Sequence, residues 1–382
     1  MPDAHAVLSA SSAHRWLACT PSALLEREFP DTTSEAAAEG TLAHAIVETK
    51  LGRIIRGQRR GKATKAQKAD PLYFPAMEDH ADNYVDFVEE LFAEARKRSP
   101  DAILCSEMRV DFSRWVPGGF GTTDTTIIAD DTMTVVDFKF GKGHAVSAEE
   151  NPQLRLYALG ALAEFGDLYD IRRIRTYIVQ PRMDIISSEE LTDGFLLDWA
   201  DAYVRPRAER AAKGEGETCA GDHCLFCRAK AACRAYAVRM AEALKYEFKD
   251  ASLLDEGEIA DILGYAERLA SWAREVKEYA LREAQAGKAF PGYKLVMGRS
   301  NRKISDETEA VKRLTKAGYD PAQFMRLRGL TDLSDLMGKD VFDKVLDGLV
   351  VKPEGKPTLV PDTDKREPIN LTDMFKEDTS NG

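Results

Sequence analysis

The sequence predicts an α/β protein in which a central sheet is flanked by helices. Segments rich in β-branched and aromatic residues come in close succession, and Asp130-Asp131 is a plausible hairpin connection between two of them. Helical segments precede and follow this group, which is typical of a helix-covered sheet rather than of an all-β sandwich. The expected strands are residues 102–112, 122–129, 132–140 and 172–182.

Helices are expected on both sides of these strands in the sequence. Residues 34–52 are rich in Ala and Leu, with Ser34 or Thr33 as a cap, and residues 78–98 have an amphipathic pattern. Pro152 suits the first position of the helix expected within 148–165. Two more helices are expected at residues 188–213 and 256–287.

The domain organisation follows from a change of composition near residue 250. Residues 1–245 are expected to form the core, and residues 250–352 a mostly helical accessory region of short helices and loops. Residues 353–382 are rich in Pro, Lys, Asp and Glu, so a flexible tail with a short apolar and acidic end is expected.

Composition limits the classes of function. The chain of 382 residues has a net charge of −11, which argues against non-specific coating of nucleic acid but allows a local basic patch. It has neither a long apolar run nor a basic and apolar N-terminal leader, so we expect a cytoplasmic protein without a membrane partner. Six cysteines in such a protein are typical of free, metal-bound or redox-active thiols.

Acidic and basic residues gather at one end of the expected hairpin. Asp137 and Lys139 are two positions apart, so they share a face of their strand, and Asp124 lies on the neighbouring strand. Two adjacent carboxylates repel each other unless a cation lies between them, and their oxygens suit Mg²⁺ or Mn²⁺. A surface ion pair is the simpler interpretation of any single D-x-K. Here the apolar run MTVVDFKF predicts a buried strand, where charges are unfavourable without a purpose.

Two further patterns accompany this hairpin. The segment GTLAH places His44 on an expected helix, and NPQLRLY places Gln153 and Tyr157 four residues apart on another. Each pattern is common by itself: a lone helical His is usually structural, and a Tyr on an amphipathic helix usually belongs to the core.

In this order, the patterns G-x-x-x-H, G-x-x-D, D-x-K and Q-x-x-x-Y resemble the RecB-like branch of the PD-(D/E)xK nuclease superfamily, over residues 10–240. The resemblance implies a restriction-endonuclease-like core with a mixed central sheet. It also implies roles for individual residues, with Glu107 as a supporting acid. The implied metal ligands are His44, Asp124, Asp137 and the Phe138 carbonyl oxygen. Lys139 would be the catalytic lysine, and the residues that position it or the DNA backbone would be Gln153 and Tyr157.

Four cysteines lie close together in CAGDHCLFCRAKAAC, with spacing that suits a tetrahedral metal or an iron–sulfur cluster. Two ligand sets are open. Zn²⁺ would use Cys219 together with Cys224, Cys227 and Cys233, whereas the second set replaces Cys219 by the distant Cys19. The second set is similar to that of the iron–sulfur nucleases of the same branch, which include AddB-type helicase–nucleases and CRISPR-associated adaptation nucleases. It therefore implies a 4Fe–4S cluster that ties the N-terminal segment to the end of the core.

The expected substrate is DNA, as single strands or duplex ends. A basic segment, residues 53–68, is expected to be a mobile loop that grips phosphate through Arg53, Arg56, Arg59, Arg60 and Lys62. Because no G-x-x-x-x-G-K-[ST] motif is present, unwinding would need a partner. The tail around Leu371 and Met374-Phe375 is a candidate docking segment for a recombination or replication protein.

The chain also resembles stand-alone RecB-like proteins of phages and prophages, which implies the host cytoplasm as its location. The sequence thus predicts a Mg²⁺- or Mn²⁺-dependent DNA exonuclease of phage or bacterial recombination, replication or repair. The alternative is a non-catalytic nucleic-acid-binding or scaffold protein on a nuclease fold. The presence of Asp124, Asp137 and Lys139 together favours the enzyme.

Overall fold

The computed structural model describes residues 6–30, 35–242, 256–294, 307–316, 321 and 329–350. The expected helix caps at Thr33 and Ser34 and the expected tail at residues 353–382 lie outside these ranges.

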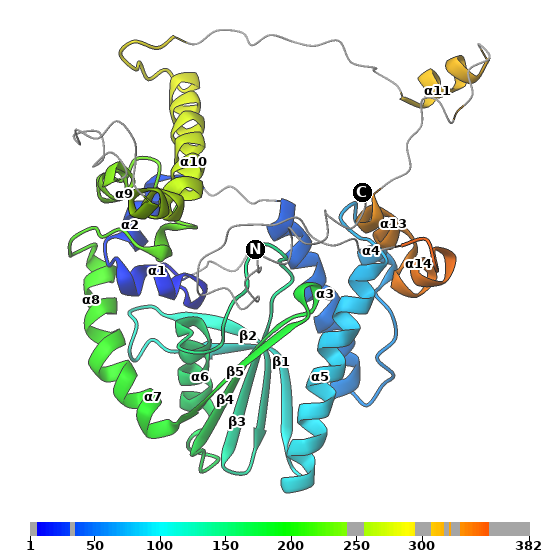
Figure 1. The fold of residues 1–382 in the computed structure, drawn as a ribbon. Coiled ribbons are helices and arrows are strands. Elements are labelled where there is room, and N and C mark those ends of the chain that lie inside the picture. Colours follow the sequence, from blue (N-terminus) through cyan, green and yellow to red (C-terminus); the bar gives the residue numbers. More distant parts are fainter. Residues whose placement is uncertain are drawn as a thin grey trace, which may run out of the picture.

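Five strands form one mixed sheet, and their order in the sheet is their order in the chain (Figure 1). Neighbouring strands are antiparallel except β3 and β4, which run parallel. The expected α/β fold with a mixed central sheet is therefore confirmed. The strands are β1 (Ile103–Asp111), β2 (Phe120–Ala129), β3 (Thr132–Phe138), β4 (Arg173–Gln180) and β5 (Ile185–Thr192).

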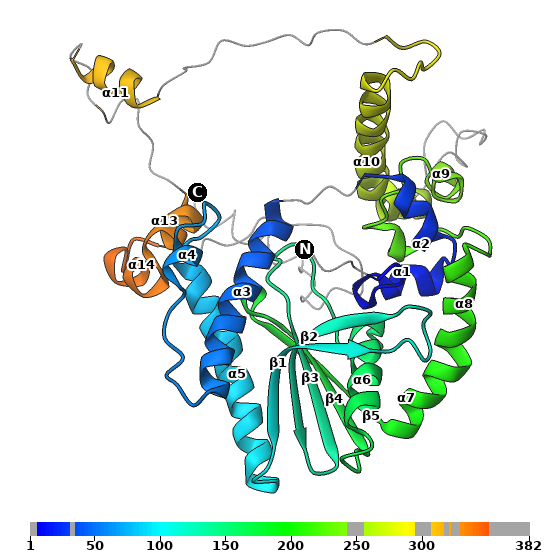
Figure 2. The same ribbon diagram turned by 180° about the vertical axis from the view of Figure 1, so that it is seen from behind.

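Helices cover both faces of the sheet (Figures 1 and 2). On one face, α3 (Glu35–Ile55) and α5 (Ala76–Arg98) bury their apolar sides against Val136 and Phe138 of β3. On the other face, α6 (Pro152–Phe165) packs against Met133 and Val135 of the same strand. Every residue of β3 is buried, as expected for the central strand of a sheet covered on both sides.

Helix α6 forms the crossover between the parallel strands β3 and β4, which a short hairpin cannot connect. Its start is fixed by Asn151, whose side chain accepts hydrogen bonds from the N–H groups of Gln153 and Leu154. Gly160 lets the helix lie close to β1, because a Cβ atom there would be 2.8 Å from the Cβ of Val110. The crossover thereby holds α6 in a fixed position beside the end of β3.

The helix expected at residues 188–213 is partly wrong, because its first residues belong to β5. Asp184, with φ of 55°, turns the chain so that β5 runs back along β4, from Gln180↔Ile185 to Arg173↔Thr192. Residues in β5 alternate between half-buried and exposed, so pairing outweighs the helix preference of Glu189 and Glu190. The helix follows as α7 (Asp193–Trp199), a π-helical turn (Ala200–Val204) and α8 (Arg205–Lys213).

The remaining helices lie around this core. At one end of α8, the N-terminal segment meets the cysteine-containing segment and the long helix expected near residue 256 (Figures 1 and 2). No helix in the described part of the chain is long and apolar enough to cross a membrane. These helices are α1 (Ala13–Ala18), α2 (Ser22–Leu25), α4 (Lys65–Lys68), α9 (Arg234–Ala241), α10 (Glu256–Gln285), α11 (Glu307–Lys316), α13 (Leu330–Met337) and α14 (Lys339–Val345).

Candidate active site and metal sites

The candidate site lies where strands β2 and β3 separate. Their pairing ends at Thr125↔Val136, and the next residues along each strand toward the site are Asp124 and Asp137. Beyond that point the backbone N–H of Phe138 has no β2 carbonyl to pair with. It donates instead to Oδ2 of Asp124 at 2.7 Å. The fork between the strands therefore places both carboxylates and fixes one of them.

Asp137 is buried, with 3% of its surface exposed, and is held by Lys139 and Gln153. Its Oδ1 accepts from Nε2 of Gln153 at 3.1 Å, and its Oδ2 lies 3.0 Å from Nζ of Lys139. The same Nζ donates to Oε1 of Gln153 at 3.1 Å, so the amide bridges the acid and the lysine. Burial raises the pKa of Asp137, although the nearby Lys139 acts in the opposite direction.

Tyr157 lies one helical turn after Gln153 on α6 and helps to position the Gln153 side chain. Its hydroxyl accepts a hydrogen bond from Nε2 of Gln153 at 3.2 Å. The Tyr157 ring covers Gly121 so closely that a Cβ atom at Gly121 would lie 2.6 Å from Cε1 of the ring. Glycine at position 121 therefore makes room for the tyrosine that positions Gln153.

His44 reaches the site from α3. Its Nδ1 lies 3.3 Å from Oδ1 of Asp124, and its ring meets that of Phe138 edge to face at 5.1 Å. Burial alone would lower the pKa of His44, but the hydrogen bond and the negative charge of Asp124 outweigh it and raise the pKa. Gly40, one turn earlier, faces open space, since no atom lies within 4 Å of a Cβ built there.

Glu107 joins this group from β1, where the register places it opposite Asp124. Its neighbours pair with β2 as Ser106↔Thr125 and Met108↔Thr123, but Glu107 and Asp124 do not pair with each other, and Glu107 has φ of 51°. Burial, together with the charge of Asp124, raises the pKa of Glu107 to about 7. Strained backbone of this kind is unfavourable by about 1–3 kcal/mol and tends to occur at functional sites.

A divalent cation fits this arrangement of donors. One ligand atom from each of His44, Glu107 and Asp124 lies within 4.8 Å of the others. The predicted ligand Asp137 is not in that group, but its buried Oδ2 has only the ion pair with Lys139 and no well-directed hydrogen bond from the described residues. Oxygen donors with one imidazole suit Mg²⁺ or Mn²⁺. Glu107 was predicted only as a supporting acid, because the positive φ at this position is not readable from residue types.

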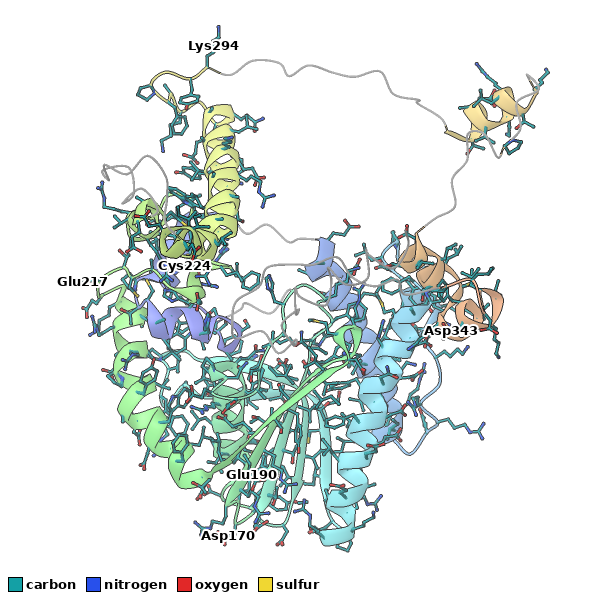
Figure 3. The ribbon with its side chains drawn as sticks, viewed as in Figure 1. Asp170, Glu190, Glu217, Cys224, Lys294 and Asp343 are labelled. Carbon is teal, nitrogen blue, oxygen red and sulfur yellow. The ribbon has the colours of Figure 1, made fainter. Side chains whose placement is uncertain are left out.

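The cysteines form a second candidate site, at the junction of α1, α9 and α10. One cavity is lined by Cys19, Cys219, Cys224, Cys227 and Cys233, although Cys19 is distant from the others in the chain. Figure 3 shows Cys224 in this region, far from Glu190 and Asp170, which lie at the opposite end of the strands. The structure therefore brings together all members of both predicted ligand sets.

His223 is a further candidate ligand in this cavity that the sequence prediction missed. One atom each of Cys19, Cys219 and His223 lies within 4.8 Å of the others. Burial raises the pKa of Cys19, but hydrogen bonds from His223 and the Cys219 backbone outweigh it and lower that pKa. Burial raises the pKa of Cys227 to about 12. Soft sulfur donors of this number fit zinc or an iron–sulfur cluster.

Comparison with protein families shows the family to which the chain belongs. The model of the family described as "Protein of unknown function (DUF2800)" matches residues 5–367. The chain belongs to the DUF2800 family. A solved structure described as "Crystal structure of SSO0001" is 17% identical to the DUF2800 chain, covering 42% of this chain and 73% of that one. Its TM-score of 0.23 is too low to support any conclusion.

The basic segment of the DUF2800 protein is more ordered than expected, because two of its arginines have structural contacts. Arg53 is still part of α3 and donates to the carbonyls of Arg60 and Lys62 at 2.9 and 2.7 Å. Arg60 forms ion pairs with three acids of α5, Asp82, Asp86 and Glu89. Their guanidinium groups thus hold the segment in place, and phosphate binding by Arg53 and Arg60 stays a prediction.

Of the five residues predicted to grip phosphate, three are exposed to a ligand. Arg56, Arg59 and Lys62 are exposed. Arg56 directly follows the last residue of α3 and comes twelve residues after His44. Twelve residues of helix separate the two backbone positions by roughly 18 Å. Any phosphate that these residues bind therefore lies away from the carboxylates.

Proposed function

We propose that this protein is a Mg²⁺- or Mn²⁺-dependent deoxyribonuclease that hydrolyses phosphodiester bonds from strand ends. Its resemblance to the RecB-like branch of the PD-(D/E)xK superfamily is part of the proposal. The observation that supports it most is the joint placement of two carboxylates, a lysine and a histidine at one strand fork: Asp124, Asp137, Lys139 and His44.

The metal would be held by His44, Glu107 and Asp124, and Asp137, which follows the last β2–β3 pair at the same strand fork, stays a predicted further ligand. A divalent ion, when bound, polarises a phosphoryl oxygen and lowers the pKa of bound water. The ligands meet because α3, the middle of β1 and the strand fork converge on one point. Their convergence leaves the site open beside Gly40, where a phosphate backbone can approach α3 closely.

Lys139 supplies positive charge to the reacting phosphate. Burial alone would lower the pKa of Lys139, but the charges of Asp137 and Asp124 raise it, so the side chain is an ammonium. Of its three N–H donors, two face Oδ2 of Asp137 and Oε1 of Gln153. The third is left for an oxygen of the scissile phosphate, where a fixed positive charge stabilises the charge that develops in the transition state.

The test is hydrolysis of end-labelled DNA by anaerobically purified protein with Mg²⁺, with Mn²⁺ or with EDTA. We expect metal-dependent release of the label, and a loss of at least about 100-fold in Asp137→Asn and Lys139→Met. Lys97→Ala, an exposed lysine at the end of α5, is the control and should leave the rate unchanged. Binding without hydrolysis under every condition would favour the non-catalytic scaffold, and cleavage at internal sites would contradict action from ends.

A further inference from the structure

A surface cavity of about 650 Å³ lies between the N-terminal segment and the cysteine site. Its volume falls within the range of about 300–1,000 Å³ that is usual for ligand sites. The lining includes Ser12, Arg15, Arg27, Phe226 and Arg228. None of these residues belongs to the carboxylate site or to the sulfur ligands.

The cavity is positively charged although the protein is acidic overall. Three arginines line it, and Glu26 is the acid among its described lining residues. Glu26 is buried and neutralised: its Oε2 lies 2.6 Å from Nε of Arg15, and its Oε1 accepts from the N–H of Arg228 at 2.8 Å. Arg27 is exposed and forms no ion pair within the described ranges. The cavity therefore complements an anionic ligand.

Phe226 presents an aromatic ring at the edge of this cavity. The side chain is 68% exposed, which is unusual for a phenylalanine. Its backbone is held on the C-terminal side, because the Phe226 carbonyl accepts from Nη1 of Arg15 at 3.5 Å and Oε1 of Glu26 accepts from the N–H of Arg228. An exposed ring on a fixed backbone beside arginines is the arrangement on which single-stranded bases stack.

The Phe226 ring contacts His144, which lies in the loop that follows β3. The two rings meet edge to face, with centroids 5.8 Å apart and planes at 83°. His144 follows Lys139 by five residues, and its carbonyl accepts from Nε2 of the buried Gln180 at 3.0 Å. Five residues span at most roughly 17 Å, a length that on the order of five stacked nucleotides covers.

We propose that this cavity binds a single-stranded segment of nucleic acid that continues from the carboxylate–lysine site, with a base on Phe226 and a phosphate beside Arg27. The proposal rests on the proposed function and names its substrate as a single strand. Bases within a duplex are stacked on each other, so the Phe226 ring is accessible to bases of single strands or frayed ends alone. Stacking does not depend on base identity, and binding should be tolerant of sequence.

The experiment measures binding apart from hydrolysis. Full-length Asp137→Asn protein, without added divalent ion, is titrated into a labelled single-stranded DNA of about 16 nucleotides and into the matching blunt duplex. We expect Phe226→Ala to weaken single-strand binding by roughly 5- to 100-fold, and Phe226→Trp to retain it. Leu225→Ala is the matched control, because Leu225 is an exposed apolar residue of the same turn that does not line the cavity.

The phosphate position beside Arg27 is tested by salt titration of the same binding reaction. Arg27→Ala should reduce the slope of log affinity against log salt by about 0.7, the value for one phosphate of a single strand. Arg234→Ala, an exposed arginine at the start of α9 that does not line the cavity, should leave the slope unchanged. An unchanged slope in Arg27→Ala would contradict the phosphate position.

Equal affinity of Phe226→Ala and Leu225→Ala would overturn the proposal, as would a parent protein that binds only the duplex or neither DNA. If Phe226→Ala loses bound metal from the cysteines, Phe226→Leu replaces it, since leucine keeps the apolar bulk without a ring face. Wild-type affinity in Phe226→Leu would also contradict stacking. Hydrolysis by the wild type is measured separately. If the wild type hydrolyses DNA but binding does not depend on Phe226, the single-strand proposal is refuted and the nuclease proposal stands. If binding depends on Phe226 but no DNA is hydrolysed, the nuclease proposal is refuted and the binding site stands.

Discussion

The carboxylate of Asp124 accepts the backbone N–H of Phe138 at 2.7 Å, across the point where β2 and β3 separate. The acid thus replaces the carbonyl that a continued strand would have supplied. This hydrogen bond sets the distance between the two strands at the candidate site. It makes one residue responsible for both the local structure and the proposed chemistry.

The two roles of Asp124 can be separated by substitution. Asp124→Ala leaves the Phe138 N–H unpaired, so we expect it to lower the free energy of unfolding by about 1–3 kcal/mol. Asp124→Asn keeps an acceptor oxygen and should lower it by less than about 1 kcal/mol, while both variants lose metal-dependent hydrolysis. Urea unfolding and DNA cleavage by both variants provide the measurement. Equal destabilisation by Asn and Ala would show that the Phe138 contact does not stabilise the fold.

Glu107 makes stability depend on pH when no divalent metal is bound. Its pKa is about 7 in the folded protein, above the ordinary 4.5, so the folded state binds the proton more tightly than the unfolded state. The stabilisation is complete below about pH 4.5 and is lost as the pH rises through 7. Glu107→Gln should therefore be more stable than wild type at pH 8, by about 1 kcal/mol after solvent screening of this partly exposed group, but not at pH 5.

Thermal unfolding in EDTA at both pH values checks this prediction, with exposed Glu90→Gln on α5 as the control that should change neither Tm. At pH 8, saturating Mg²⁺ should make the wild type more stable than Glu107→Gln, since only the wild type keeps the full set of proposed ligands. A pH-independent difference between Glu107→Gln and wild type would contradict the raised pKa.

Substitution of two glycines by alanine should change the stability of the protein in opposite directions. Gly40 faces open space on α3, so Gly40→Ala should stabilise the protein by about 0.5–1 kcal/mol. Gly121→Ala forces the Tyr157 ring away and with it Gln153, so it should destabilise by about 1–3 kcal/mol and reduce hydrolysis. Denaturation curves and hydrolysis rates of both variants test this pair. A Gly40→Ala variant that is stabilised but cleaves DNA more slowly would indicate that the substrate backbone passes over position 40.

Metal analysis should separate the two cysteine ligand sets. We expect about four iron and four sulfide per chain in anaerobically purified protein, lost in Cys19→Ser and retained in Cys219→Ser. The reason is that a 4Fe–4S cluster takes four thiolates, which Cys19, Cys224, Cys227 and Cys233 supply from one cavity. One zinc per chain that persists in Cys19→Ser and disappears in Cys219→Ser would establish the local set instead. Because the hydrogen bond from His223 lowers the pKa of Cys19, His223→Ala should weaken the cluster form.

Arginines of the basic segment should divide into structural and ligand-facing ones. Arg60→Ala removes ion pairs with three acids of α5 and should lower the free energy of unfolding by about 1 kcal/mol. Exposed Arg56→Ala should leave unfolding unchanged but reduce the salt dependence of DNA binding. Chemical denaturation and salt titrations of binding test both. The assignment of Arg60 as structural and Arg56 as ligand-facing fails if Arg60→Ala is as stable as the wild type and Arg56→Ala is less stable.

Much of the fold was predictable because its signals are local in the sequence. The β-branched runs of β2 and β3 and the proline at the start of α6 predicted these elements correctly. The strand β5 was missed because its pairing with β4 overrides the helix preference of its glutamates.

Within the candidate site, spacing along β3 was enough to place Asp137 and Lys139 together. The position of Glu107 within reach of His44 and Asp124 depends on its positive φ, which has no residue signature at a glutamate. The contacts of Arg53 and Arg60 depend on how α3 and α5 pack, which a run of basic residues does not reveal. Contacts between side chains that meet only through tertiary packing therefore could not be predicted from spacing in the sequence.

The order of the strands in the sheet has a consequence for synthesis on the ribosome. Because β1 to β5 lie side by side in the order in which they are made, each new strand can add to an edge that already exists. The cysteine site breaks this order, since Cys19 must wait until Cys233 has left the exit tunnel. The sulfur site can therefore close only after all five strands have been made, although the N-terminal segment also packs on α6.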